Sequence, residues 1–305
     1  MPLPIILAHQ GKKSITLELV LKQLRQSNPT AKIYFLTDDE FPNLDFISIV
    51  NSNEHSKLAN EFAKSYTHMS DKNEEQTLFN IQRWFLIYDF MKVHNIDKAM
   101  ILNTNTLLYT SVSVIEEKVE NLSSLIVPEQ TADLSWEASG HCSIWFQHHL
   151  LQLVSFIDII YSSKLFLLKR KWDWHQKQNI SGGISEETLL YLFYKDYPSY
   201  FYNSLVIENN SCMDVNIRHH SAIIQREIAA EKVSFLTNGA LKKIKFRQKK
   251  PYGLKVVSKN TVAFHTIHLG DNSNYLIYRF YTGPKPMFFF LKVIIFYLLG
   301  LVKKA

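Results

Sequence analysis

Two asparagines that follow a short apolar stretch are the first residues in this sequence with the spacing of a ligand site. Ala99-Met-Ile-Leu102 predicts a buried strand, and Asn103-Thr-Asn105 comes directly after it. Side chains two residues apart leave an extended segment on the same side. Carboxamides offer oxygen ligands and hydrogen-bond donors, but they lack the negative charge that holds a hard cation. The pair therefore predicts a polar site with low affinity for metal ions, or a strand-ending turn, which Asn also favours.

Arg83 is a charged residue in a segment with apolar residues on every side. Residues 75–94 predict a helix with apolar residues on every side: Phe79, Ile81, Trp84, Phe85, Leu86, Tyr88, Phe90 and Met91. This pattern is typical of a helix buried within a domain. An unpaired buried guanidinium is very costly, so the sequence predicts an anionic partner for Arg83.

Three more polar residues follow predicted strands near the N-terminus. Residues 5–8 and 33–36 are short apolar runs, separated by a leucine-rich helix over 15–24. In a βαβ unit of this kind, the loops after the strands open on the edge of the sheet where α/β proteins bind ligands. His9, Gln10 and Asp38 are the candidates in those loops, with a helix cap or a turn as the alternative for Asp38.

The second half of the sequence offers a histidine and two carboxylates. His141 follows Gly140, and it is either a site residue or a structural histidine. Glu186 and Glu187 open a helix predicted over 186–194, with Ser185 as its N-cap. A carboxylate there is a candidate general base, although Glu in a first turn also stabilises the helix dipole.

His265 and His268 lie on a predicted strand near the end of the chain. Three residues apart on a strand, they point to opposite faces and do not chelate one ion together. His268, which is next to a turn, is the better candidate.

The elements around these residues predict an α/β fold. Strand and helix signals alternate in the first third, as in a domain with a parallel sheet. One domain over residues 1–283 and a tail over 284–305 are the expected division, because no repeat or Pro- or Gly-rich linker interrupts the chain. Further predicted strands are 46–50, 124–127, 201–208 and 262–268, with a short helix at 58–66 and a helix-rich stretch over 143–168.

Composition narrows the class of protein. With 46% hydrophobic residues in 305, the chain can bury a sizeable core, which excludes extended disorder. Its net charge of +6 suits anionic partners. Only two cysteines occur, Cys142 and Cys212, so we expect buried, inert thiols and a reducing, cytoplasmic location. The N-terminus lacks the pattern of a secretion signal.

The C-terminal tail is the expected membrane contact. Residues 287–302 are almost wholly apolar apart from Lys292, and Lys303 and Lys304 follow. A bilayer span needs about 20 apolar residues, so we expect 287–304 to lie on the inner face of the cell membrane as a peripheral anchor. A C-terminal helix packed on the domain core is the alternative.

In its order of motifs, the sequence resembles GT-A-type glycosyltransferases, especially bacterial members. There a helix carrying Arg-Trp, here Arg83-Trp84, precedes an apolar strand and an Asp-x-Asp motif. The resemblance covers about residues 3–282 and implies a Rossmann-type mixed, mainly parallel sheet flanked by helices. In the family the acidic pair binds Mn²⁺ or Mg²⁺, which bridges the two phosphates of a nucleotide-diphosphate sugar. Asn103 and Asn105 replace both acids here.

The resemblance also implies roles for residues in the first half of the chain. His9 and Gln10 match the nucleotide-binding loop after the first strand, and Asp38 matches the loop that contacts the base. Arg83, Asn103 and Asn105 then surround the diphosphate.

Further roles are implied in the second half. His141 matches a segment that approaches the donor sugar and the acceptor. Glu186 is the first candidate, and Glu187 the second, for the base that deprotonates the acceptor hydroxyl. His268 matches a late histidine that meets the metal or the diphosphate, so any metal would rely on Asn105 and His268. The family's following lysine is replaced by Asn274, and the basic run 242–250 is a candidate source of positive charge or a solvated surface.

Three hypotheses follow for the function. The first is a glycosyltransferase, working with or without metal, that moves a sugar to a glycan or lipid-linked acceptor in surface polysaccharide or lipopolysaccharide synthesis. The second is a catalytically silent subunit that binds sugar nucleotides or glycans. The third is nucleic-acid binding through the basic stretches 164–177 and 242–255, which lack a recognised motif, so nucleic acid is not expected as a partner.

Overall fold

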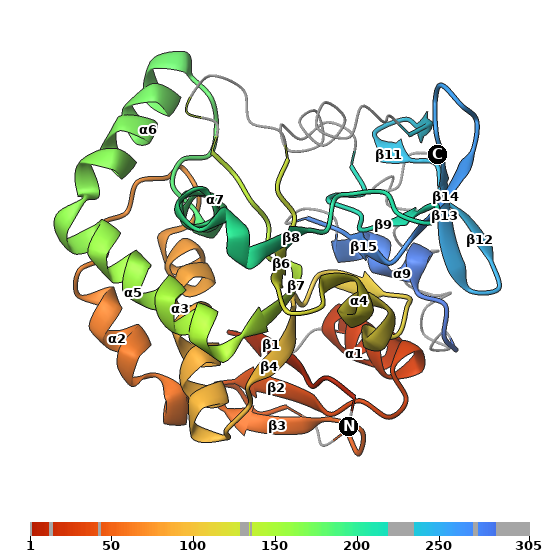
Figure 1. Cartoon of the computed structure of the whole chain (residues 1–305), viewed down its shortest axis with the longest axis horizontal. Coiled ribbons are helices and arrows are strands. Elements are labelled where there is room, and N and C mark those ends of the chain that lie inside the picture. The colour runs from red at the N-terminus through yellow and green to blue at the C-terminus, as the bar shows by residue number, and fades with distance from the viewer. Residues whose placement is uncertain are drawn as a thin grey trace, which may run out of the picture. The chain divides into compact units, whose positions relative to one another are not determined.

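The structure, a computed structural model, describes residues 2–11, 15–41, 44–128, 134, 136–218, 235–270 and 274–284. The chain divides into two compact units. The first unit contains Met1–Lys13, Thr30–Thr104 and Val112–Leu205, and the second contains Ser14–Pro29, Asn105–Ser111 and Val206–Ala305. Figure 1 shows the elements of both units in the colours of the sequence.

A mixed, mainly parallel sheet forms the centre of the first unit. Its strands lie in the order β3 (Ser48–Asn51), β2 (Ile33–Thr37), β1 (Ile5–His9), β4 (Lys98–Leu102) and β7 (Cys142–Phe146). β3, β2, β1 and β4 pair in parallel, and β7 runs antiparallel to β4. The predicted α/β fold with a mainly parallel sheet is therefore confirmed.

Strands β1 and β4 are apolar and buried along most of their length. Ile5 to Ala8 in β1 and Ala99 to Leu102 in β4 are all buried, as is usual for parallel sheets. His9 pairs with Thr37 at the ends of β1 and β2. Since β1, β2 and β4 are parallel, the residues that follow them share one edge of the sheet.

Helices cover the sheet of the first unit. Their bounds are η1 (Ser52–His55), α2 (Lys57–Ala63), α3 (Glu74–Val93), α4 (Val112–Val119), α5 (Gln147–Ser163), α6 (Leu165–Gln178), α7 (Glu186–Asp196) and η2 (Pro198–Tyr200). In Figure 1, α2, α3 and α5 lie on one side of this sheet. Ile6, Leu36 and Ile101 from the sheet share a hydrophobic core with Trp84 of α3 and Leu153 of α5.

Two short strands complete the first unit. β6 (Ser123–Leu125) and β8 (Phe201–Asn203) pair in parallel. The side chain of Asn203 extends the pairing, because its Oδ1 accepts from Val127 N at 3.1 Å and its Nδ2 donates to Val127 O at 2.8 Å.

Several predicted boundaries were wrong. The stretch over 143–168 was expected to be rich in helix, but it begins inside β7, because Cys142-Ser-Ile-Trp-Phe146 pairs along the whole of β4. The third strand begins at Ser48, after a turn at Asp45-Phe46. The strand expected over 201–208 ends at Asn203, and that over 262–268 is interrupted at His265.

The described part of the second unit contains helices and several small sheets. It contains α1 (Ile15–Ser27), η3 (Asn274–Leu276) and α9 (Ile277–Phe280). Its strands are β5 (Thr106–Leu108), β9 (Ser211–Cys212), β10 (Thr237–Asn238), β11 (Leu241–Lys242), β12 (Lys245–Arg247), β13 (Lys250–Leu254), β14 (Thr261–Phe264) and β15 (Thr266–His268).

Pairing in the second unit is mostly antiparallel. β12, β13, β14 and β9 form one sheet, β10 pairs with β11, and β15 pairs with β5. One apolar cluster contains Cys212, Phe235, Val262 and Phe264. The one-domain division of the chain stays a prediction, because much of the expected tail, 284–305, lies outside the described residues.

The membrane prediction falls on residues that the structure does not describe. The expected contact through 287–304 lies entirely there, so it stays a prediction. Among the described helices, none by itself has the length and apolar composition of a membrane span; α5 and α6 meet both criteria only as a pair, with a bend of 77° between them.

Candidate functional site

Helix α3 brings Arg83 into the core of the first unit. Arg83 is only 5% exposed, in a helix whose neighbouring residues Trp84, Phe85 and Leu86 are also buried. Its guanidinium forms an ion pair with Glu186, the first residue of α7. The predicted anionic partner of Arg83 is therefore confirmed, and it is a side chain 103 residues further along the chain.

Glu186 receives three hydrogen bonds. Arg83 Nε donates to Oε2 at 2.9 Å and Nη2 donates to Oε1 at 2.8 Å, which is the paired geometry that guanidinium and carboxylate groups favour. Trp84 Nε1 donates to Oε2 at 2.9 Å. Burial raises the pKa of Glu186 to about 7, although the Arg83 charge and the Trp84 hydrogen bond act in the opposite direction.

Asn103 lies at the carboxyl end of β4, within reach of Arg83. Its side-chain Oδ1 accepts a hydrogen bond from Arg83 Nη1. Its backbone N donates to His141 O at 2.8 Å. Arg83, Asn103, Glu186 and Trp84, which we call the Arg83 cluster, thus join two helices to the end of a central strand.

His141 is next to this cluster but almost fully buried. It is 1% exposed, and its Nδ1 lies 2.8 Å from Ser139 Oγ. Gly140 is required at the preceding position, because a Cβ there would lie 2.7 Å from the ring of Trp84. Glu187 is half-buried, and its backbone O accepts from Ala138 N at 2.9 Å.

His9, Gln10 and Asp38 lie at the edge of the sheet reached by the ends of β1 and β2. His9 is half-buried and stacks on Phe35, with ring centroids 6.0 Å apart. Gln10 and Asp38 are exposed. Because the strands are parallel, these residues and Asn103 follow the same edge. The structure therefore places these four candidates of the first unit along one edge of the sheet. Their roles in binding stay predictions.

Asn105 and His268 belong to the second unit. Asn105 lies in the turn before β5, and His268 is the last residue of β15, which pairs with β5. Leu269 N donates to Asn105 O at 3.1 Å, and His268 pairs with Thr106. His268 Nδ1 lies 3.0 Å from Thr106 Oγ1, and its backbone N donates to Asp214 Oδ2. The Oδ1 atom of Asn105 is buried and has no hydrogen-bond partner among the described residues.

Asp214 and Lys242 form a buried ion pair that the sequence did not predict. Lys242 Nζ donates to Asp214 Oδ1 at 2.8 Å, and both side chains are 1% exposed. Lys242 was expected in a basic run that was a candidate source of positive charge or a solvated surface. This contact and its position over the rings of Phe235 and Phe264 instead place it in the core. The run Leu241-Lys242-Lys243 gave no signal that could have identified Lys242 as the buried lysine.

The donor groups near the two asparagines do not fit a divalent metal ion. Asn103 Oδ1 is in contact with a guanidinium, and the side-chain oxygen of Asn105 is uncharged. Hard cations require several oxygen ligands, usually with carboxylates among them. Within the described ranges, no group of three or more His, Cys, Asp or Glu side chains is arranged to hold a metal ion.

Comparisons with known proteins rest on structure. No protein-family model and no curated protein matches the sequence. The apo form of mouse xyloside xylosyltransferase 1 aligns with 94% of this chain and 100% of its own, with a TM-score of 0.51 at 8% identity. The glycosyltransferase GlyE of Streptococcus pneumoniae TIGR4 aligns with 100% of this chain and 65% of its own, with a TM-score of 0.40 at 11% identity. The first likeness shows that the chain has a glycosyltransferase fold.

Proposed function

We propose that this protein transfers a sugar from a nucleotide-sugar donor to a hydroxyl group of a glycan or lipid-linked acceptor. The observation that carries the proposal is the Arg83 cluster at the carboxyl end of β4, in a chain with a glycosyltransferase fold. In this position Arg83 is a fixed positive group beside the strand end where the resemblance expects the diphosphate.

The reaction would need charge stabilisation at the leaving group. The acceptor oxygen attacks the anomeric carbon, the bond from that carbon to the phosphate oxygen breaks, and the acceptor proton passes to a base. The nucleoside diphosphate leaves with an additional negative charge, which a preorganised cation stabilises. A guanidinium has five N–H donors in a planar fork, more than its contacts with Glu186 and Asn103 use.

The charge of the Arg83 cluster depends on Glu186. While Glu186 is ionised, the pair is neutral; when Glu186 holds a proton, the pair is positive. The pKa of Glu186, raised to about 7 by burial, makes both forms accessible near neutral pH. Since both carboxylate oxygens accept hydrogen bonds from Arg83 or Trp84, we propose that Glu186 positions Arg83, and that Glu187 is the better candidate for the base.

Nucleotide binding tests the proposal first. We expect one of the uridine, guanosine, cytidine or thymidine diphosphates, or a sugar conjugate of one, to raise the melting temperature by mass action. The Asn103→Asp variant places a carboxylate beside Arg83, so affinity for that nucleotide should fall about tenfold. Asn121→Asp, at an exposed position of the same unit, makes the same change of charge and is the matched control. Equal affinities of the two variants, or no stabilisation by any nucleotide, would contradict the proposal.

Turnover separates the enzyme from a silent binding subunit. Two observations favour the second function. Asparagines stand at 103 and 105, where the resemblance expects acidic residues, and both carboxylate oxygens of Glu186 already accept hydrogen bonds from Arg83. Donor hydrolysis or transfer that persists in the presence of a chelator would support the transferase. Tight binding without turnover, with or without manganese, would support the binding subunit.

A further inference from the structure

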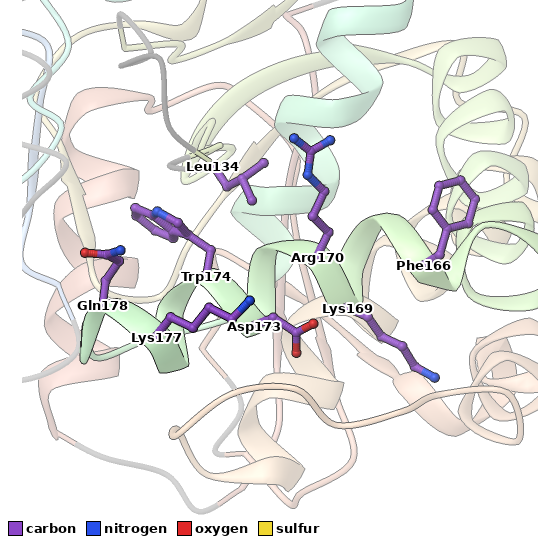
Figure 2. A pocket seen from close by; sticks show the side chains of 8 residues that line it. All are labelled: Leu134, Phe166, Lys169, Arg170, Asp173, Trp174, Lys177 and Gln178. Carbon is purple, nitrogen blue, oxygen red and sulfur yellow. The ribbon is translucent and has the colours of Figure 1, made fainter.

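One face of helix α6 forms a groove on the first unit. A cavity of about 420 Å³ lies along the helix. Leu134, which is not part of α6, also lines this cavity. Residues three and four apart on a helix share a face, and the seven lining side chains of α6 follow that spacing: Phe166, Lys169, Arg170, Asp173, Trp174, Lys177 and Gln178. Figure 2 shows Arg170 and Trp174 directed towards Leu134, with Lys169 and Asp173 directed away from it.

The lining combines cations with aromatic rings. Lys169, Arg170 and Lys177 contribute three positive charges against the single negative charge of Asp173. Phe166 is 65% exposed, and the indole of Trp174 is half-buried. A concave site with aromatic walls and a few polar groups is the usual form of a small-molecule site. Its net charge selects anionic ligands.

Asp173 limits which anionic ligands can bind in the groove. A carboxylate among the cations repels a continuous phosphate backbone or the surface of an anionic membrane, but it accepts hydrogen bonds from hydroxyl groups. The apolar faces of Phe166 and Trp174 suit the C–H face of a pyranose ring. Arg170 suits a carboxylate or phosphate, which its planar fork binds through two hydrogen bonds. We infer that the α6 groove binds an acidic saccharide, a chain of sugars that carries carboxylate or phosphate groups.

The opposite face of α6 holds the groove in a fixed position. Lys171 is fully buried, and its Nζ donates to Trp136 O at 2.6 Å and to Thr188 Oγ1 of α7 at 2.8 Å. Leu168 and His175 are also buried on this side. A rigid helix presents its exposed side chains without a cost of ordering the backbone at binding, so only the side chains lose freedom. The residues that line the groove include none of the Arg83 cluster, so binding in the groove is measured without any nucleotide.

Direct binding to the full-length protein tests this inference. The probes are a galacturonate hexasaccharide, the neutral maltohexaose, vesicles of phosphatidylglycerol and phosphatidylcholine, and a single-stranded thymidine oligonucleotide. The combined variant Lys169→Gln, Arg170→Gln, Lys177→Gln removes the cations of the groove. Its matched control, Lys57→Gln, Lys64→Gln, Lys92→Gln, removes three exposed lysines elsewhere in the same unit.

We expect the galacturonate hexasaccharide to bind more tightly than the other three probes. The groove variant should weaken that binding about tenfold or more, because it removes the charge-assisted hydrogen bonds to the acidic groups, while the control stays within about twofold. Phe166→Ala, at a position that is 65% exposed, should also weaken it without changing the melting temperature.

Three results would overturn the inference. The first is equal affinity of the groove variant and its control for the acidic hexasaccharide. The second is tighter binding of vesicles or of the oligonucleotide, lost in the groove variant, which would assign the groove to a membrane or to nucleic acid. The third is no binding of the acidic hexasaccharide to the unmodified protein. Each is independent of nucleotide binding at the Arg83 cluster.

Discussion

Arg83 and Glu186 form a buried ion pair, and its energetics depend on both partners. Each side chain is 6% exposed, so each charge has lost most of its hydration. Removal of one partner of such a pair costs roughly 3–5 kcal/mol, whereas replacement of both by well-packed apolar groups is often neutral. The pair therefore specifies which helices come together more than it adds to stability.

The Arg83→Met variant should become less stable as pH rises. The pKa of Glu186 is raised from 4.5 to about 7 by burial, so its favourable contribution is present below 4.5 and is lost as pH rises through about 7. The Arg83 charge lowers this pKa, so its removal should raise the pKa further and extend the loss to higher pH. Urea unfolding at a series of pH values measures it. The control Arg83→Met, Glu186→Gln should lack this slope; parallel curves for both variants would refute the assignment.

His149 predicts a loss of stability in acid. It stacks on Tyr200 with centroids 4.4 Å apart, and its Nδ1 lies 2.8 Å from Ser123 Oγ. Burial, with a contribution from the His148 charge, lowers its pKa from 6.5 to about 4. The unfolded chain therefore takes up the proton first, and stability falls between pH 6.5 and 4.

A pair of histidine variants checks this expectation. His149→Gln should lose less stability over that interval than the unmodified protein, as measured by urea unfolding. His148→Gln, at the exposed neighbouring position, is the control and should keep most of the loss. The expectation fails if both variants follow the unmodified protein.

At the scale of elements, helices α3 and α7 are tied together just before they begin. Ile184 N donates to Met69 O at 2.7 Å, and Asp71 N donates to Gly182 O at 3.0 Å. The Asp71 carboxylate accepts from Ser181 Oγ at 2.7 Å and from Gly182 N at 2.9 Å. This connection fixes the starts of the helices that carry Arg83 and Glu186.

Gly183 is the position where this connection is most sensitive. Its φ is +135°, and a Cβ there would lie 2.4 Å from Met69 O and 2.7 Å from Ser70 Cα. Gly183→Ala should therefore cost about 1–3 kcal/mol more than Gly11→Ala, which has a φ of +91° but no atom within 4 Å of the added Cβ. Chemical unfolding of both variants measures the difference. Equal costs would show that backbone strain alone acts at Gly183.

At the scale of the whole molecule, each compact unit contains one cysteine. Cys142 lies in the first unit and Cys212 in the second, and both are buried. Burial raises the pKa of Cys142 to about 12, so its thiol is unreactive while the unit is folded. A thiol reagent therefore reports the opening of each unit separately.

The second unit should open first. The strands around Cys212 are short, β9 having two residues, while Cys142 lies in the central sheet of the first unit. Local opening takes less free energy where fewer apolar groups are buried. In the Cys142→Ser variant, labelling of Cys212 should begin at a lower denaturant concentration than labelling of Cys142 in Cys212→Ser. Coincident labelling would indicate that the chain unfolds as one cooperative system.

Three strands of the central sheet, β1, β2 and β4, and the character of α3 could be predicted from the sequence alone. Apolar runs at 5–8, 33–36 and 99–102 and a helix over 75–94 depend on neighbours along the chain, and each element formed within a few residues of its predicted bounds. The sequence also predicted that Arg83 has an anionic partner, because the cost of an unpaired buried charge does not depend on the fold.

The partners of the buried polar groups, in contrast, depend on the folded chain. Arg83 contacts Glu186 and Asn103, and Lys242 contacts Asp214. Each contact joins residues that are far apart in sequence. The strand at Cys142–Phe146 was decided in the same way, by pairing with β4. Local composition fixes what each segment can become, whereas the partners of buried polar groups depend on which segments the folded chain brings together.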